Sequence, residues 1–312
     1  MAVSHSWRWL AGALFTLAGM LAANSMLGPL VADVIDYRMS TTLVNQLIAL
    51  DVVSLAVIAP LAVLAGVLVL RGHRAGPVLA IAPAAFTAYM IAQTIVGSDY
   101  LGVPGNNERW FPWHLGLFVL GVVTLVGAWR GVDGRELPAA SRRRDRWTAV
   151  ALFGLAVFVA VVQWVPALAD MMRDRPTRAD YLSNPAMTWT LALLDLGIAT
   201  PAAVAAGIGL LRGTDWGRRV AYSVVGFFAL VGPAVAAMAI TMQVNDDPNA
   251  AVANVAVMSA AGLALALLGV AVYRPLLRRR AAAQPRSRAG VPGTFVPSHQ
   301  RPGTLIGHRQ RP

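Results

Sequence analysis

The chain contains no cysteine and no lysine, and charged residues of either sign are scarce. The absence of cysteine excludes disulfides, thiol redox chemistry and iron–sulfur ligation, and the absence of lysine excludes Schiff-base chemistry such as that of a retinal pigment. Charged residues make up 13% of the chain, whereas soluble globular domains contain about 25%. Because 57% of the residues are hydrophobic, this composition indicates a protein embedded in a membrane.

Eight apolar stretches are long enough to cross a hydrocarbon core, which takes about 20 helical residues. They lie at 8–31, 43–70, 76–97, 112–129, 147–169, 187–211, 219–242 and 250–273. The first is too long for the apolar region of a signal peptide and lacks an A-x-A site, so we expect it to be retained. The sequence therefore predicts an all-α polytopic membrane bundle of eight transmembrane helices.

The net charge of +11 is distributed very unevenly along the chain. All 26 basic residues are arginines, and 21 of them fall on one side of the membrane if both termini lie on that side. Since basic loops stay in the cytoplasm, we predict that both termini are cytoplasmic and that the protein lies in a bacterial inner membrane. The positive charge then faces lipid, and nucleic acid is not an expected partner.

An internal repeat with an offset of 141 residues divides the chain. Residues 49–76, ALDVVSLAVIAPLAVLAGVLVLRGHRAG, resemble residues 193–217, LLDLGIATPAAVAAGIGLLRGTDWG. The identities are Pro60, Gly66, Leu70, Arg71, Gly72 and Gly76 against Pro201, Gly207, Leu211, Arg212, Gly213 and Gly217. Each half has four spans, an even number, so we expect two parallel four-helix repeats that lie the same way up in the membrane.

The repeat predicts four regions. These are a first four-helix membrane repeat at 1–132, a cytoplasmic linker at 133–146, a second repeat at 147–277 and a tail at 278–312. The tail is rich in Arg, Pro and Gly and poor in large apolar residues, so we expect it to be disordered. Arg278, Arg279 and Arg280 are expected to lie against anionic lipid of the inner leaflet, or else simply to flank the last span.

Asp51 and Asp195 are the only carboxylates inside the predicted spans. An acid at the centre of a membrane helix costs about 2.5–3.5 kcal/mol on insertion scales and is a functional candidate by default. The functional interpretation is an acid that binds a ligand or couples a proton or cation to transport. The alternative is an acid that is solvated near the outer boundary or bonded to a neighbouring span.

Amide side chains gather in the outer half of the predicted spans, whereas the inner half is almost purely apolar. They are Asn24, Asn45, Gln46, Gln93, Gln163, Gln243 and Asn254. Polar groups in lipid need partners, so we expect these side chains to point inward. They predict an outward-facing polar pocket for a small polar solute or a lipid headgroup; the alternative is hydrogen bonding between helices, worth about 0.6 kcal/mol per contact.

His114 follows an aromatic run at the outer boundary, which is typical of an aromatic belt. A role for His114 in pH sensing or headgroup binding is one hypothesis. One histidine without a second ligand at metal spacing predicts neither a metal site nor a cofactor. The sequence contains no visible Ser-His-Asp or HExxH arrangement, so we do not expect an enzyme. A lipid-processing enzyme would need His114 together with an outer-half acid.

The second and sixth spans share the pattern LD, P, G, LRG and G, in which the sixth span extends LRG to LLRG. This pattern resembles uncharacterised multi-spanning inner-membrane proteins of high-GC bacteria. That resemblance implies a duplicated four-helix unit and carries no activity with it. The leading hypothesis is a permease-like or small-solute-binding membrane protein with an outward-facing polar pocket between the two repeats. The alternative is a non-catalytic scaffold or accessory subunit that acts through its basic tail.

Overall fold

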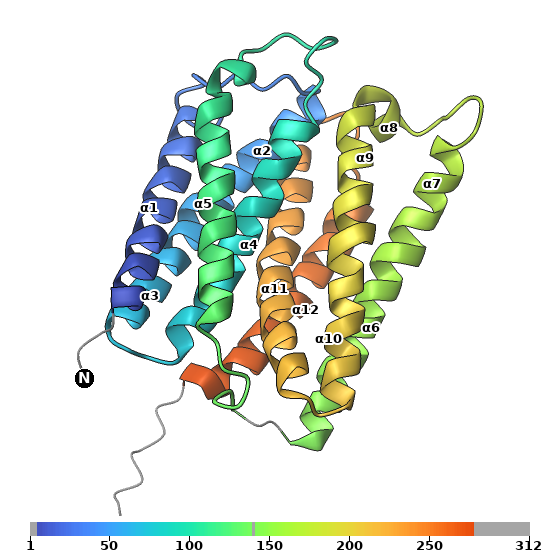
Figure 1. The fold of residues 1–312 in the computed structure, drawn as a ribbon. Helices are drawn as coiled ribbons and strands as arrows, with labels where there is room; N and C mark the ends of the chain where they lie inside the picture. The colour runs from blue at the N-terminus through green and yellow to red at the C-terminus, as the bar shows by residue number, and fades with distance from the viewer. Residues whose placement is uncertain (1–4, 139–140, 278–312) are drawn as a thin grey trace, which may run out of the picture. The chain divides into compact units, whose positions relative to one another are not determined.

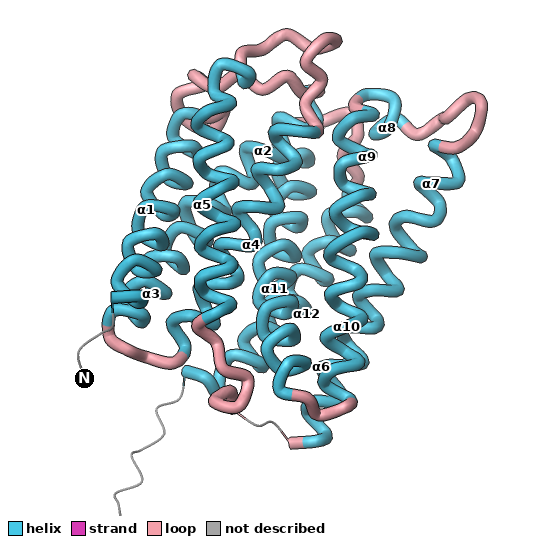
Figure 2. Tube along the Cα trace, in the orientation of Figure 1, coloured by secondary structure: helices cyan, strands magenta, loops and turns pink. Residues whose placement is uncertain are grey.

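The computed structural model describes residues 5–138 and 141–277, and within them helices are joined by short loops without a β-strand (Figures 1 and 2). Within these described ranges, eight helical spans are long and apolar enough to cross a membrane, which agrees with the predicted number. The expected tail, including Arg278, Arg279 and Arg280, lies outside the described residues.

In the first half of the chain four spans pack in a closed ring. They are α1 (His5–Leu27), the combined span α2 (Thr41–Val53), η1 (Ser54–Ile58) and α3 (Ala59–Leu70), then α4 (Ala75–Val96), and η2 (Asn107–Trp110) with α5 (Phe111–Arg130). The segment η1 is π-helical and η2 is a 3-10 turn. Helix α3 contacts α1 and α4, and α5 closes the ring by contacting α4 and α1.

In the second half the spans pack in a row rather than a ring. They are α6 (Arg142–Val157), η3 (Phe158–Trp164) and α7 (Val165–Met171), then, after the short α8 (Ala179–Ser183), α9 (Pro185–Leu194), η4 (Asp195–Ala199) and α10 (Thr200–Leu211), then α11 (Asp215–Val244) and α12 (Val252–Leu277). Helix α6 packs on α10, α10 on α11 and α11 on α12. Helix α11 also packs on α2 and α4, which joins the two halves.

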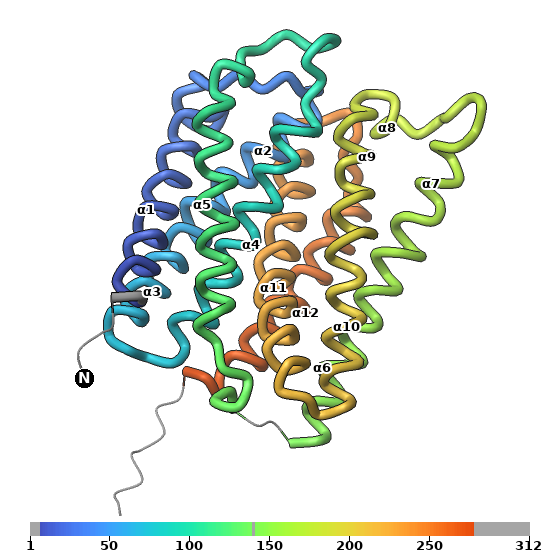
Figure 3. The backbone as a smooth tube through the Cα atoms, in the orientation of Figure 1, coloured from blue at the N-terminus to red at the C-terminus, as the bar shows by residue number. Residues whose placement is uncertain are grey.

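The two ends of the bundle differ in charge. The arginine-rich end is the one where α1 begins, α3 ends and α12 ends, and the carboxylate-rich end is the one where α1 ends and α2 begins (Figure 3). Arg71, Arg74, Arg130 and Arg274 lie at the arginine-rich end, at the limits of their spans. The boundary charges therefore follow the one-sided distribution seen in the sequence.

Several helix boundaries differ from the predicted spans by a few residues, and two of them have clear local reasons. Helix α1 ends at Leu27 rather than near residue 31, because the chain turns at Gly28 and Pro29 cannot donate a helical hydrogen bond. Helix α6 begins at Arg142, within the region predicted as linker. The Ser141 side chain caps it by accepting a hydrogen bond of 3.3 Å from the backbone N–H of Arg144.

The three π-helical segments in the described part of the chain each end two residues before a proline. Segment η1 precedes Pro60, η4 precedes Pro201 and η3 precedes Pro166. Proline removes a backbone donor, and a wider turn accommodates the missing hydrogen bond. The bounds of η1 and η4 differ by 141 residues, and so do the bounds of α3 and α10, which follow them. This is the same offset as that of the aligned sequences.

Glycines allow the same close packing in both pairs of neighbouring spans. A Cβ on Gly66 would lie 2.9 Å from the ring of Phe15, and a Cβ on Gly207 would lie 2.7 Å from the ring of Phe153. A side chain at either position would collide with the aromatic ring of the preceding span. Small residues of this kind let membrane helices approach closely.

Arg144 joins the arginine-rich ends of α6 and α12. Its Nη2 donates to the carbonyl oxygens of Ala271 at 2.6 Å and Val272 at 2.9 Å. Pro275, four residues after Ala271, has no N–H to donate to that carbonyl. Arg144 therefore supplies the hydrogen bond that the proline removes from α12.

Candidate functional site

Asp51 is buried inside the first-half bundle beside a small cavity. Its side chain is 7% exposed, and its Oδ2 has no hydrogen-bond partner among the described residues. The cavity has a volume of about 40 Å³, which is enough for a water molecule. Its polar walls come from α1, the following loop, η1 and α4: Asn24, Ser25, Tyr37, Ser54, Thr87 and Thr94.

A chain of polar contacts extends this site toward α5. The Nδ2 of Asn24 donates to the hydroxyl of Tyr37 at 3.4 Å, and Trp113 Nε1 donates to Asn24 Oδ1 at 3.2 Å. The rings of Tyr37 and His114 lie 5.9 Å apart. His114 is 2% exposed, and its Nε2 has no partner in the described part of the chain. Asn24, Asp51 and His114, predicted separately, thus lie around one tyrosine; we call these four residues the Asp51 cluster.

Tyr37 was not identified from the sequence because it lies in a loop rather than in a span. Its burial first, and then the nearby carboxylate of Asp51, raise the pKa of Tyr37 above its ordinary value. Its hydroxyl therefore stays protonated and remains able to donate a hydrogen bond. Ile35 and Met39 flank it as buried apolar residues, and this alternation of buried positions is the signal that the loop folds inward.

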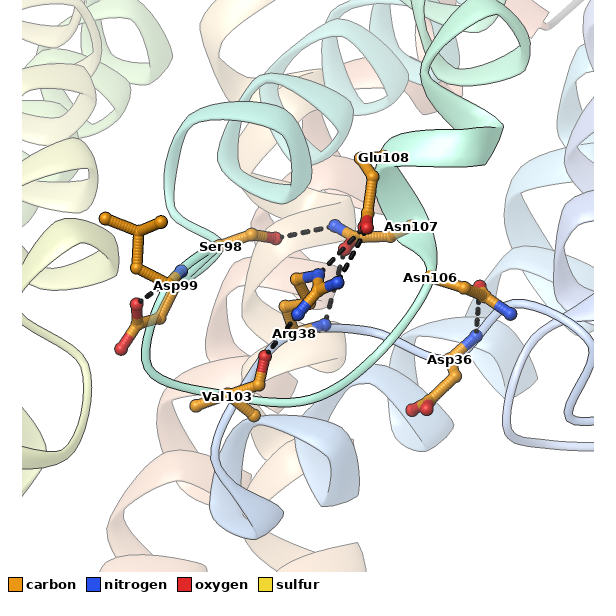
Figure 4. Close-up of polar contacts among 9 residues, drawn as sticks. Asp36, Arg38, Ser98, Asp99, Val103, Asn106, Asn107 and Glu108 are labelled. Carbon is orange, nitrogen blue, oxygen red and sulfur yellow. Dashed lines mark hydrogen bonds and ion pairs between the residues drawn. The ribbon is translucent and has the colours of Figure 1, made fainter.

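Two loops close the carboxylate-rich end over this cluster, and Figure 4 shows how they are joined. Arg38 Nε and Nη2 donate to the two carboxylate oxygens of Glu108 at 2.8 and 2.6 Å. Arg38 Nη1 donates to the carbonyl of Val103 at 2.9 Å. The hydrogen bond to Glu108 raises the pKa of Arg38. Backbone bonds from Asp99 N–H to Arg38 O and from Asn106 N–H to Asp36 O, both 2.8 Å, complete the junction.

Asp195 occupies a different environment. Its Oδ1 accepts a hydrogen bond from the Tyr89 hydroxyl, and its Oδ2 accepts one of 2.9 Å from Trp164 Nε1. Helix α4 separates the two acids. Thr87 and Ile91 line the cavity of Asp51, and residues two positions away on a helix, such as Tyr89, lie on nearly the opposite face. Asp195 therefore has a partner for each oxygen, and Asp51 does not.

Asn45 joins the two halves instead of lining the cavity. Its Nδ2 donates to Asp247 Oδ2 at 2.8 Å, and its Oδ1 accepts from Asn245 Nδ2 at 2.8 Å. Asp247 is 5% exposed and also accepts from Thr42 Oγ1 at 3.0 Å. This contact between α2 and the loop before α12 is a structural link between spans.

The predicted glutamines are not brought to the Asp51 cluster. Gln93 is buried on α4 but is not among the residues that line the cavity, and Gln163 is exposed on η3. Gln46 contacts the sulfur of Met242 at 3.5 Å. Of the seven predicted site residues, the structure therefore gathers Asn24, Asp51 and His114, and leaves Asn45, Gln93, Gln163 and Asp195 elsewhere.

The residue types of the cluster limit its chemistry. Among the described residues, no three or more His, Asp or Glu side chains are grouped to hold a metal ion. The cavity presents one carboxylate among hydroxyl and amide groups, with no basic side chain in its lining. A proton or a single monovalent cation would balance that carboxylate, whereas a divalent ion would leave an excess positive charge in a low-dielectric site.

Comparison with protein-family models, with curated proteins and with solved structures finds no match to this chain.

Proposed function

We propose that this chain is a permease-like membrane protein in which Asp51 binds and releases a proton or a small monovalent cation. The observation that carries the proposal is the buried, unpartnered Oδ2 of Asp51 beside a cavity of about 40 Å³. An isolated carboxylate in a low-dielectric interior is strongly disfavoured unless it is paired or neutralised. With no basic side chain lining the cavity, an exchangeable proton or cation is the available counter-charge.

The size of the cavity at Asp51 supports a bound ion rather than a larger solute. Ligand pockets for small molecules are typically about 300–1,000 Å³, whereas the cavity at Asp51 has room for a water or an ion. We therefore assign the coupling ion to Asp51. We also propose an outward-facing pocket for a small polar solute between the two halves. The cavity at Asp51 is too small to be that pocket.

The proposal includes a duplicated chain of two parallel four-helix repeats in a bacterial inner membrane, with both termini in the cytoplasm. Its support is the 141-residue offset shared by η1 with η4 and by α3 with α10, and the arginines at one end of the spans. Basic loops are retained in the cytoplasm, so the arginine-rich end would be the cytoplasmic one.

The scaffold alternative has an observation of its own. Asp195 and Asn45 are both fully engaged by neighbouring spans, as structural polar groups would be. In that case the basic residues 278–312, outside the described residues, would recruit the partner or lipid. The two functions differ in what they require of Asp51.

Infrared difference spectroscopy of the full chain in lipid tests the proposal. Difference spectra are recorded between acidic and alkaline buffer, once with sodium and once with the bulky cation choline. They should show a carboxylic-acid band that titrates with pH. If a small cation competes with the proton for Asp51, sodium should also change this band. The band should disappear in Asp51→Asn and persist in the matched Asp195→Asn variant. A spectrum identical in Asp51→Asn and the unmodified protein would reject Asp51 as the exchanging acid and favour the scaffold.

A further inference from the structure

A groove runs along the outer surface of the first-half bundle between α1 and α5, close to the arginine-rich end. Its volume is about 610 Å³. Trp9, Val123 and Val126 in its walls are 44%, 48% and 44% exposed, on spans that cross the membrane. Side chains exposed on a membrane span face lipid, so this groove is open to the acyl region of the bilayer.

A second cavity, of about 450 Å³, lies at the ends of the same spans. Its floor is apolar and buried, and consists of Val69, Val78, Val132, Leu137 and Leu276. Arg74 lies on its rim at the start of α4, and the exposed Asp133 and Glu136 lie on the rim after α5. The rim therefore presents a cation and two carboxylates at the boundary of the spans.

The two cavities share Trp7 and Gly131, and glycines make room for their tryptophan walls. A Cβ on Gly131 would lie 2.6 Å from the Trp7 ring, and a Cβ on Gly127 would overlap the Trp9 ring. The rings thus rest directly on α5, one turn apart. An apolar groove within the membrane consequently adjoins a charged cavity at its surface, with Trp7 between them.

We propose that this pair of cavities binds one aminophospholipid, a zwitterionic lipid with a primary ammonium headgroup, from the leaflet at the arginine-rich end. An acyl chain would lie in the groove along α1 and α5. The phosphate would pair with Arg74 or with Arg130, which lines the groove at the end of α5. The ammonium would pair with Asp133 and Glu136.

The charge pattern selects this lipid class. An anionic headgroup would meet two carboxylates on the rim, and like charges in close juxtaposition are disfavoured. A choline headgroup has the same net charge as an ammonium headgroup but no N–H to donate. Within residues 5–138 and 141–277, the ion pairs involve none of Arg74, Arg130, Asp133 and Glu136.

Native mass spectrometry of the full chain tests the site. The chain is released from nanodiscs that contain equal amounts of phosphatidylethanolamine, phosphatidylcholine and phosphatidylglycerol with identical acyl chains. The main readout is the ratio of retained ethanolamine to choline lipid, because both are net neutral and basic residues elsewhere attract them equally. We expect an enrichment of about threefold for the ethanolamine lipid, the scale of a partly exposed charge pair. The double variant Asp133→Asn/Glu136→Gln should return the ratio to one.

A second variant and a control complete the experiment. The double variant Arg74→Ala/Arg130→Ala should reduce retention of all three lipids, since each carries a phosphate and these are the two arginines that can pair with it. Arg135→Ala is the matched control, because its side chain is 84% exposed, pairs with Asp215 at 3.6 Å and lies outside both cavities. Equal retention of the two neutral lipids by the unmodified chain would overturn the proposal. So would an enrichment that survives the double carboxylate variant, or a preference for the glycerol lipid.

Discussion

Replacing each intramembrane acid by asparagine should change stability in opposite directions. The side chains are nearly isosteric, so the substitution removes the charge and little else. At Asp195 both oxygens accept hydrogen bonds, from Tyr89 and Trp164. At Asp51 the Oδ2 is buried and accepts none from the described residues.

The magnitudes follow from those partners. At Asp195 two hydrogen bonds to a charged acceptor, worth about 1.5–3 kcal/mol each, become neutral bonds worth about 0.5–1.5 kcal/mol each. Trp164 can only donate and must keep the amide oxygen, whereas Tyr89 can rotate its hydroxyl and accept from the new NH₂ group. Relief of charge desolvation offsets part of the loss, so we expect a net destabilisation of about 1 kcal/mol. Asp51→Asn gains the same relief and loses no bond to Oδ2, so we expect a change between zero and about 1 kcal/mol of stabilisation.

Thermal unfolding in detergent, followed by intrinsic tryptophan fluorescence, measures the difference. Thiol-reactive reporters are unsuitable because the chain has no cysteine. A difference of 1–2 kcal/mol corresponds to a separation of roughly 2–8 °C between the two variants for a domain of this size, provided that both are scanned at the same rate. Asp195→Asn should unfold below the unmodified protein and Asp51→Asn at or above it.

Unfolding of Asp51→Asn at a lower temperature than Asp195→Asn would contradict the partners assigned to the two acids. In choline buffer, where no small cation is bound, that order would mean that Asp51 has a strong hydrogen-bond partner in the folded state and that Asp195 does not depend on Tyr89 and Trp164. Equal losses in both variants would equally contradict the assignment, because the bonding of the two carboxylates would then make no difference to stability.

Two further substitutions test the packing. Gly66→Ala and Gly207→Ala should each lower stability by about 1–3 kcal/mol, because the added methyl group meets an aromatic ring of the preceding span. Thermal unfolding measures both losses, and a loss in only one variant would show that the two contacts are not equivalent. Arg144→Ala should cost about 0.5–1.5 kcal/mol, the net worth of a typical hydrogen bond, because the carbonyl of Ala271 is exposed and water can replace part of the lost bond. In a Pro275→Ala background, where the helix regains its own N–H donor, that loss should shrink, and a double-mutant cycle with no coupling between positions 144 and 275 would contradict this account.

The number and approximate limits of the spans could be predicted because they depend on local hydrophobicity, a property of consecutive residues. The direction in which a polar side chain points could not. Asn24 and Gln163 were both predicted at outer-half depth, yet the first is buried at the Asp51 cluster and the second is exposed. Depth follows from position along a helix, whereas direction depends on how the helix is rotated, and spans that are apolar all round give little periodic signal for that rotation.

The π-helical segments make such predictions harder still. A π turn contains an extra residue and therefore shifts the phase of everything after it by roughly 100° relative to a regular α-helix. In the second span η1 begins three residues after Asp51, and in the sixth η4 begins at Asp195 itself. A regular helical wheel drawn across either span would misplace the residues on one side of the π segment. The prolines at 60 and 201 mark the positions where this happens, which is the part that the sequence does show.

The same offset shows why the two acids differ in chemistry. At a separation of 141 residues the counterpart of Asp195 is Ser54, and the counterpart of Asp51 is Ala192. Ser54 lines the cavity of Asp51, so the position that carries the acid in the sixth span carries a hydroxyl of the cluster in the second. Under the proposed duplication, each half therefore carries one acid. When the two spans are aligned, the two acids occupy positions three residues apart, which is about one helical turn. In the second half the acid lies where two donors reach it, and in the first half it lies beside an open cavity; only the latter arrangement leaves a carboxylate oxygen free to exchange a proton or cation.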